Sequence, residues 1–310
     1  TSEQIMFETG TLGIPEFGTG FTISMLVDTK PKSFAELIKI SGLSHGTDVW
    51  LGNAQELIRN GTVAFKDVIG CRDDIMVYLM YHGLEPIKAF KIMEFVRKGK
   101  ATKDPETWKG HVETMQKAGI EEWFIESCHK IKYMFPKAHA AAYVMSAFRI
   151  AYYKVHKPMV YYASYFSTRF DDFDITAMIN GYESIKNKII EINNKGYDAS
   201  NKESSVLETL KLALEATARG VIFGNIDLMK SDAKNFIIDD DNKTLIPPFR
   251  SIDGLGDVVA QNICEEAKKK PFISVEEFQK RCKVSQTLVD KMKVMGILNN
   301  MPETSQLSLF

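Results

Sequence analysis

The most regular hydrophobic pattern in the chain lies in residues 135–153, FPKAHAAAYVMSAFRIAYY. The alanines at 138, 140, 141, 142 and 147 favour a helix, because alanine loses no side-chain entropy on becoming helical. Pro136 fits the first helical position, where its fixed φ is already suitable. A period of 3.6 residues places Lys137 at the mouth of one face of this helix. The residues that share this face are His139, Tyr143, Ser146, Ile150 and Tyr153.

This face supports two interpretations. Lysine, histidine and tyrosine at the start of a helix, where backbone N–H groups have no intrahelical acceptor, suit an anionic ligand such as a triphosphate. The same aromatic stripe is typical of a buried core helix whose polar groups are satisfied locally. Periodicity alone favours the core helix.

Amphipathic patterns on both sides of this segment predict a mainly α protein. Ser33 and Glu36 form a capping-box pattern that opens a helix, and Gly42 is expected to end it. Asp174 is expected to cap a later helix. Near residues 205–220 the pattern changes to β-branched and aromatic runs broken by Gly, Asp-Asn and Pro-Pro, which indicates a small β-containing piece. Another helical pattern is bracketed by Gly70 and Pro86, and further ones cover residues 53–61, 89–100, 104–123, 126–134, 157–170, 176–193 and 204–218.

Length and charge allow two domains but give no global argument for nucleic acid. The chain has 310 residues, 45% of them apolar, and a net charge of −1, which are ordinary values for a globular protein. Residues 88–157 differ, with 14 Lys and Arg against 7 Asp and Glu, a net charge of +7. One basic face is therefore available for an anionic partner, although many solvated helix faces have similar charge.

The four cysteines form no C-x-x-C pair. Their spacing argues against a zinc site and a disulfide framework, and fits a reducing cytoplasm. The sequence shows no signal peptide and no run of 18 apolar residues, so no membrane partner is expected.

Residues 251–263, SIDGLGDVVAQNI, contain a glycine hairpin followed by a helix. Gly254 and Gly256 are expected to allow a tight backbone turn, and the free N–H groups there can bind a DNA phosphate. Leu255 is expected to plug the hairpin, with Ala260 and Ile263 packed inward. This pattern is typical of a helix-hairpin-helix element. Residues 284–298, VSQTLVDKMKVMGIL, resemble a degenerate second copy with Gly296 in the corresponding turn.

The segment FPKAHAAAYVMSAFRIAYYKVHKP closely resembles the fingers of the PolC-type bacterial DNA polymerase III alpha subunit. TLGIPEFGTGFTISMLVDTKPKSFAELI resembles the junction from palm to fingers in the same family. The resemblance covers essentially the whole chain. It implies a multi-helix fingers domain followed by a small α+β domain with tandem helix-hairpin-helix motifs. The implied boundaries are 1–31 for the junction, 32–205 for the fingers, 206–300 for the duplex-binding domain and 301–310 for a flexible tail.

The resemblance also implies which residues bind substrates. Each basic residue has a simpler interpretation as a solvated cation at a helix end. The residues implied to contact the nucleoside triphosphate or template are Lys137, His139, Tyr143, Arg72, Lys91, Arg97 and Lys98. Those implied to contact duplex DNA are Gly254, Leu255, Gly256 and Asp257. The last five residues match the QL-x-LF peptide that bacterial polymerases insert into the sliding clamp, which implies clamp contacts by Gln306, Leu307, Leu309 and Phe310.

Catalytic carboxylates are not expected in this chain. A polymerase palm holds two metal ions about 3.5–4 Å apart with converging carboxylates. Asp73 and Asp74 are adjacent on a helix and cannot converge, and Asp172 and Asp174 lie between two helices. We therefore assign no catalytic residue and no metal ligand, and expect Mg²⁺ in the palm of the parent enzyme. The sequence begins without an initiator Met, so we expect the chain to be a fragment of the parent enzyme. This fragment alone is expected to have no polymerase activity.

The expected function is thus part of a replicative DNA-directed DNA polymerase. Its implied partners are primer–template DNA, a deoxynucleoside triphosphate, the sliding clamp and other replisome proteins. A free-standing, non-catalytic helix-hairpin-helix protein is the main alternative, and a module that only recruits a clamp is another. Affinity for a nucleoside triphosphate around Lys137 and His139 separates the polymerase from both alternatives.

Overall fold

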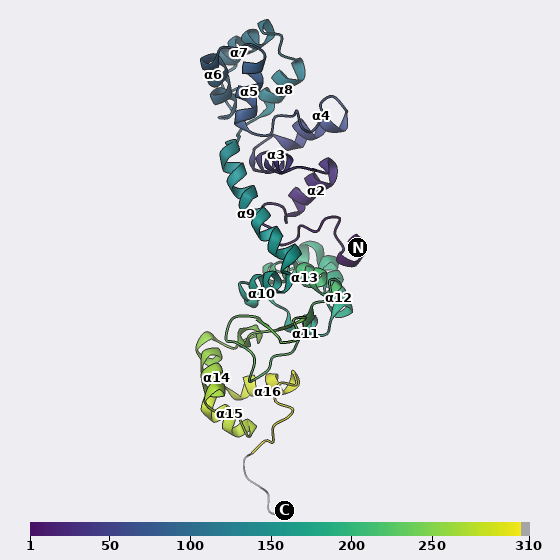
Figure 1. Cartoon of the computed structure of the whole chain (residues 1–310), viewed down its shortest axis with the longest axis vertical. Coiled ribbons are helices and arrows are strands. Elements are labelled where there is room, and N and C mark those ends of the chain that lie inside the picture. Colours follow the sequence, from purple (N-terminus) through teal and green to yellow (C-terminus); the bar gives the residue numbers. More distant parts are fainter. Residues whose placement is uncertain (305–310) are drawn as a thin grey trace, which may run out of the picture. The chain divides into compact units, whose positions relative to one another are not determined.

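The computed structural model describes residues 1–304, and these residues form a mainly helical chain with one small sheet (Figure 1). The expected mainly α fold class is confirmed. The chain divides into two compact units. The first unit is residues 8–151, and the second unit joins residues 1–7 to the chain from Tyr152 onward.

The first unit is built mainly from helices, with a kinked π-turn at Trp50–Ala54 and an isolated bridge between Thr47 and Tyr133. Helices α5 and α6 pack against each other, and Tyr78 of α5 stacks on Phe124 with ring centroids 4.1 Å apart. The helices are α2 (Gly20–Thr29), α3 (Phe34–His45), α4 (Gln55–Arg59), α5 (Arg72–Tyr81), α6 (Pro86–Val96), α7 (Pro105–Lys117), α8 (Glu122–Lys130) and the first part of α9 (Lys137–His156).

Helix α3 confirms one sequence prediction and corrects another. Ser33 and Glu36 form the expected capping box. Gly42 does not end the helix, which continues to His45. A Cβ atom at Gly42 would lie 2.4 Å from the carbonyl oxygen of Gly70. The glycine is therefore required by close packing of α3 against the segment before α5, and not by a helix end.

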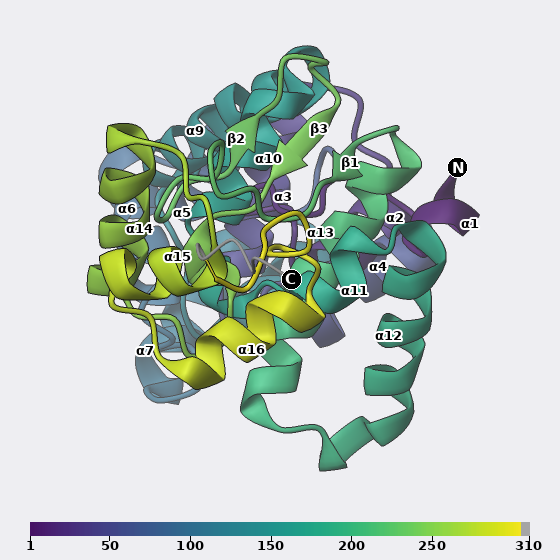
Figure 2. The ribbon, with the colours of Figure 1, turned by 90° about the horizontal axis from the view of Figure 1, so that it is seen from below.

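The second unit combines helices with a three-stranded sheet of order β1-β3-β2 (Figure 2). β1 (Ile222–Phe223) pairs parallel to β3 (Thr244–Ile246), and β2 (Ile237–Ile238) pairs antiparallel to β3. Asp174 caps α11, as predicted. The helices are α1 (Ser2–Ile5), the end of α9, α10 (Pro158–Ser167), α11 (Ile175–Ile179), α12 (Tyr182–Lys195), α13 (Asn201–Ala218), α14 (Asp257–Lys269), α15 (Val275–Cys282) and α16 (Gln286–Val294), with 3₁₀ turns at Phe170–Asp172, Gly196–Asp198 and Phe249–Ser251.

A buried ion pair ties the end of α9 to α13. The Lys154 ammonium lies 2.8 Å from Glu215, and both side chains are 4% exposed. Burial lowers the pKa of Lys154, and the Glu215 carboxylate opposes that shift. The compact units divide at residue 151. The boundaries at 32–205 for the fingers and 206–300 for the next domain stay predictions.

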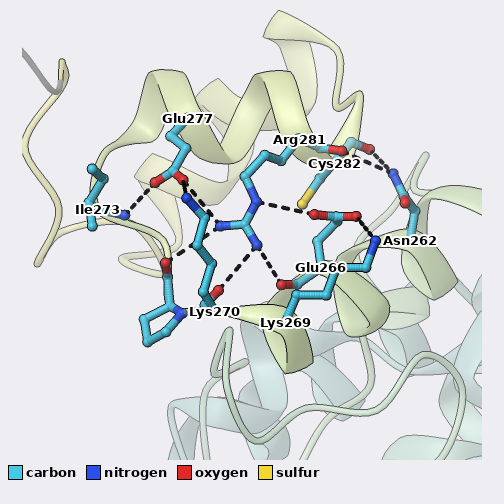
Figure 3. A network of polar contacts seen from close by, with 9 residues as sticks. Asn262, Glu266, Lys269, Lys270, Ile273, Glu277, Arg281 and Cys282 are labelled. Carbon is cyan, nitrogen blue, oxygen red and sulfur yellow. Dashed lines mark hydrogen bonds and ion pairs between the residues drawn. The ribbon is translucent and has the colours of Figure 1, made fainter.

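Arg281 holds α15 against α14 (Figure 3). Its Nε donates to the Glu266 carboxylate at 3.1 Å, and its Nη2 donates to the Glu266 carbonyl at 2.6 Å. The same guanidinium donates to Glu277 and lies over the Phe272 ring at 4.5 Å. A planar guanidinium with several fixed donors suits this role. Arg281 thus connects the start of the loop after α14 and the end of α14 to α15.

Candidate nucleotide and DNA interface

The face of α9 predicted to bind an anion is largely exposed. His139 and Ser146 are exposed, and Tyr143 is 48% exposed. The opposite face is buried instead, through Ala140, Val144 and Ala147. The buried-core interpretation of this stripe is therefore wrong. Side chains at the start of α9 are available to a ligand.

Lys137 lies at the start of α9 beside two carboxylates of α5. Its backbone N–H donates to Asp73 Oδ2 at 2.7 Å, and its Nζ lies 3.4 Å from Asp74 Oδ1. The Asp74 carboxylate raises the pKa of Lys137, so the amine is held in its charged form. The side chain remains 54% exposed. A partly solvated cation that is held in place at the start of a helix can bind an anionic group.

His139 belongs to an aromatic cluster that sequence reasoning found only in part. Its ring lies 4.8 Å from that of Phe135 and 4.7 Å from that of Tyr143. His45, at the end of α3, lies 5.3 Å from Phe135, and its Nε2 is 2.5 Å from Glu16. No local pattern indicates His45, because its place beside α9 depends on packing between distant segments.

Glu94 gathers three of the predicted cations. Arg97 donates to it through Nε and through Nη2, the latter at 2.9 Å, and Lys98 Nζ lies 2.9 Å away. Arg72 Nη1 lies 3.9 Å from the same carboxylate. Hydrogen bonds from Arg97 and Lys98 lower the pKa of Glu94 to about 2. One carboxylate thus faces three cations, which leaves an excess of positive charge.

Backbone hydrogen bonds attach this cationic cluster to the segment that enters α9. The Arg72 N–H donates to the carbonyl of Phe135 at 3.1 Å, and the Met134 N–H donates to the carbonyl of Arg97 at 3.3 Å. Arg72, Arg97 and Lys98 are therefore brought together near Lys137. Lys91 is exposed on α6 and makes no ion pair with any residue in the part of the chain that the structure describes.

The two aspartates of α5 are engaged in holding backbone and lysine groups. Asp74 accepts from the N–H groups of Gly70 and Cys71 and lies 3.6 Å from Lys39 Nζ. Within residues 1–304, no three His, Cys, Asp or Glu side chains are grouped as a metal site. The residues present do not fit the two Mg²⁺ ions of a polymerase palm.

The glycine hairpin forms as predicted at Gly254 but not at Gly256. Gly254 has a φ of +87°, which favours glycine. Gly256 has a φ of −80° and open space around its Cα, so its backbone would accept a side chain. Our expectation that both glycines need a special conformation is wrong for Gly256. Leu255, Ala260 and Ile263 are fully buried, as predicted.

Cations from two elements brace the hairpin. Arg250 donates to the carbonyl of Leu255, and Lys291 Nζ donates to the carbonyl of Asp253 at 3.0 Å. Asp257 pairs with Lys234 at 2.6 Å and with Arg250 at 2.7 Å. The Lys234 hydrogen bond lowers the pKa of Asp257, whose charge would repel a phosphate. Among the described residues, the N–H groups of residues 256–258 have no acceptor, so the backbone offers the anion-binding donors.

The hairpin of the second copy lies before α16 and not at Gly296, where the sequence placed it. Lys283 has a φ of +56°, Val284 is 4% exposed, and Ser285 caps α16. These three positions match Gly254, Leu255 and Gly256 before α14. Gly296 follows α16 and lies in the turn that ends it, so our assignment of Gly296 to the hairpin is wrong.

The start of the predicted tail is attached to the second unit. The N–H groups of Val275 and Glu276 donate to the carbonyls of Pro302 and Glu303, at 2.9 and 3.1 Å. Glu303 also pairs with Lys293 at 2.8 Å. The expectation of a flexible tail over 301–310 is therefore wrong for Pro302 and Glu303. The backbone N–H groups at the start of α15 have no intrahelical acceptor, and they bind the carbonyls of these two residues. The clamp-binding candidates Gln306, Leu307, Leu309 and Phe310 lie outside the described residues.

Two family models match the chain. Residues 3–119 match the bacterial DNA polymerase III alpha subunit finger domain, and residues 220–307 match a helix-hairpin-helix motif. Over all 310 residues the chain is 57% identical to "DNA polymerase III PolC-type" of Halalkalibacterium halodurans and of Bacillus subtilis, and 56% identical to that of Bacillus cereus. This chain belongs to the PolC-type DNA polymerase III family. It spans 21% of the length of these curated relatives.

Membership of the PolC family agrees with the order of parts in the chain. A finger-domain match is followed by a helix-hairpin-helix match, as the sequence predicted. The finger-domain match ends inside the first unit, so the exposed face of α9 lies beyond it. In the part of the chain that the structure describes, no helix is both long and apolar enough to cross a membrane.

Proposed function

We propose that this chain is the substrate-handling part of a replicative DNA-directed DNA polymerase. The start of α9 binds the triphosphate of the incoming deoxynucleotide, and the helix-hairpin-helix region grips the product duplex. Residues 306–310 dock on the sliding clamp. Catalytic carboxylates and Mg²⁺ belong to a palm elsewhere in the parent enzyme, which works in the cytoplasm with other replisome proteins.

The observation that carries this proposal is the exposed start of α9 in a PolC relative. Lys137 is fixed by Asp74 yet half exposed, and Arg72, Arg97 and Lys98 converge on Glu94 beside the entry to the helix. A triphosphate carries several negative charges, and a cluster of fixed cations stabilises it electrostatically. His139 and Tyr143 extend this surface along α9 with polar and aromatic groups.

The test is steady-state kinetics of the complete polymerase that contains this chain. A hydrogen bond from a charged group contributes about 1.5–3 kcal/mol. Lys137→Ala is therefore expected to raise the KM for deoxynucleotide roughly tenfold or more, since 1.4 kcal/mol corresponds to about a factor of ten. His139→Ala is expected to raise the KM in the same direction.

Lys117→Ala serves as the control, because Lys117 is an exposed lysine at the end of α7. This substitution removes one positive charge at a site on α7, and it should leave the KM for deoxynucleotide unchanged. If Lys137→Ala has the wild-type KM and kcat, the start of α9 does not bind the nucleotide and has only a structural role. The chain would then fit the alternative of a DNA-binding protein that grips duplex through its hairpin alone.

A further inference from the structure

A pocket in the second unit is lined by cations and by no carboxylate. It has a volume of about 590 Å³ and lies where the end of α9, the end of α13 and the start of β3 meet. Lys157, Arg219 and Lys243 line it, together with His156 and Asn242. We call these residues the cationic pocket. They come from three separate parts of the sequence, so no local pattern indicates the site.

The charges of the cationic pocket are only partly balanced from behind. Arg219 donates to the Tyr162 hydroxyl at 3.0 Å and lies 3.9 Å from Glu215. Glu215 is already bound by Lys154 at 2.8 Å and by the Tyr162 hydroxyl at 2.7 Å. One buried carboxylate therefore serves two cations. A positive charge remains on Arg219, whose side chain is 34% exposed.

The lysines of the pocket are exposed, and Asp241, a neighbouring carboxylate in the sequence, binds backbone groups and also attracts the charge of Lys243. Asp241 accepts from the backbone N–H groups of Lys243 and Thr244, both at 2.8 Å, and from the Thr244 hydroxyl. No ion pair joins Lys157 or Lys243 to another residue in the described part of the chain. Three cations with no lining carboxylate form a site for a phosphate group.

Exposed aromatic rings lie directly beside this pocket. Tyr152 is 56% exposed, and its ring lies 4.5 Å from that of His156, which lines the pocket. Tyr153 is 51% exposed and lies 5.9 Å from Tyr152. Aromatic side chains next to cations are the combination that binds single-stranded nucleic acid, because bases stack on the rings while phosphates contact the cations.

We propose that the cationic pocket and Tyr152 form a binding site for single-stranded nucleic acid. The strand places a phosphate between Lys157, Arg219 and Lys243, and an adjacent base stacks on Tyr152. The site takes a single strand rather than a duplex, because paired bases are stacked on one another and cannot reach a tyrosine ring. This inference rests on the proposed function, since a polymerase that grips product duplex also meets unpaired template.

The test measures binding of a fluorescein-labelled oligothymidylate to the chain by fluorescence anisotropy over a range of salt concentrations. Each phosphate contact of a single strand contributes about 0.7 to the slope of log affinity against log salt. Lys157→Gln with Lys243→Gln should make the slope shallower by up to about 0.7, which is the contribution of the one phosphate that both lysines contact. Tyr152→Ala should leave the slope unchanged and lower the affinity about fivefold or more, because it removes only stacking.

The matched control is Lys186→Gln with Lys188→Gln, two lysines of α12 that do not line the pocket. It changes the net charge equally and should leave the slope as in the wild-type chain. An equal change in control and test variants would overturn the proposal. An unchanged slope in Lys157→Gln with Lys243→Gln, or wild-type affinity in Tyr152→Ala, would also overturn it.

Competitors identify the ligand. Unlabelled single strand should displace the probe, whereas duplex or free deoxynucleoside triphosphate at equal phosphate concentration should displace it less. Stronger displacement by either of these would overturn the assignment to a single strand. The proposed nucleotide site is tested separately by the KM of Lys137→Ala. A normal KM shift with no effect at the pocket would reject this inference and leave the polymerase proposal intact.

Discussion

Glu94 is the residue on which the cations of the first unit converge. Its folded pKa of about 2 is below its ordinary value of 4.5. A carboxylate with a lowered folded pKa stabilises the folded state above its unfolded pKa, and this contribution is lost as the pH falls through the folded pKa. The contribution of Glu94 is therefore present above about pH 4.5 and disappears toward pH 2.

Glu94→Gln should lower the melting temperature above about pH 4.5, because Arg97 and Lys98 lose their common charged partner. The difference from wild type should shrink as the pH falls from 4.5 to about 2. Thermal unfolding followed by circular dichroism at a series of pH values measures this difference. Glu85→Gln is the control, since Glu85 pairs with Lys88 at an exposed site. A difference that persists at pH 2 would contradict the charge-based role of Glu94.

Local sequence identified some site residues and could not identify others. Lys137 and His139 were found because helical periodicity places them on one face at a helix start. His45 and Glu94 were missed, because their roles arise from contacts between segments far apart in the sequence. The cationic pocket was missed for the same reason. Periodicity alone favoured burial of the face that carries His139 and Tyr143, whereas the structure buries the face with Ala140, Val144 and Ala147.

In the hairpin before α14, the two glycines have different roles. Gly254 adopts a positive φ, and Gly256 leaves space for a phosphate. A side chain at Gly254 would occupy a φ of +87°, and such strained residues cost about 1–3 kcal/mol. Gly256 is not strained, but a phosphate bound by the first N–H groups of α14 must approach it closely. Gly254→Val should therefore lower both the melting temperature and the duplex affinity. Gly256→Val should lower only the duplex affinity.

Duplex affinity in this comparison is measured with several sequences, because backbone contacts carry no sequence information. Gly256→Val should weaken binding to all of them about equally and reduce the salt slope by roughly one contact. Gly61→Val, far from the hairpin in sequence and at another positive φ, controls for strain alone. A loss on only some sequences, or a Gly256→Val variant that binds like wild type, would contradict backbone recognition at this hairpin.

Elements defined by caps were easier to predict than elements that end at glycine. The Ser33 capping box and the Asp174 cap were confirmed, because each depends on residues three apart. Gly42 and Gly296 were misassigned, since glycine serves helix ends, hairpins and close packing alike. Lys283 takes the glycine position in the second hairpin, which a search for glycine cannot find.

At the scale of the whole molecule, long-range contacts set the division into units. The Lys154–Glu215 pair attaches the end of α9 to α13, and the Tyr182 hydroxyl donates to the carbonyl of Gln4 at 2.8 Å. Neither contact has a local sequence signal. The mainly α class and the order of finger and helix-hairpin-helix parts were predictable, whereas the boundary at residue 151 was not.

The tail gives a further prediction at this scale. Burying a leucine or phenylalanine side chain contributes about 1.5–3 kcal/mol. Leu309→Ala with Phe310→Ala should therefore weaken binding to the sliding clamp about a hundredfold or more and leave duplex affinity unchanged. Titration of clamp and of duplex against both chains measures this. Glu303→Gln, which breaks the pair with Lys293, should retain clamp binding; equal clamp affinity in all chains would exclude the tail as the docking segment.

The central claim is that the exposed start of α9 binds the incoming triphosphate, and photo-crosslinking tests it most directly. A deoxynucleoside triphosphate with a photoreactive group on its γ-phosphate is bound to the complete polymerase with primer–template DNA, irradiated, and the labelled peptide is identified by mass spectrometry. The label is expected on the peptide that holds Lys137 and His139, and unlabelled deoxynucleotide should remove it. Labelling confined to other segments, or labelling of this peptide that unlabelled nucleotide does not reduce, would contradict the claim.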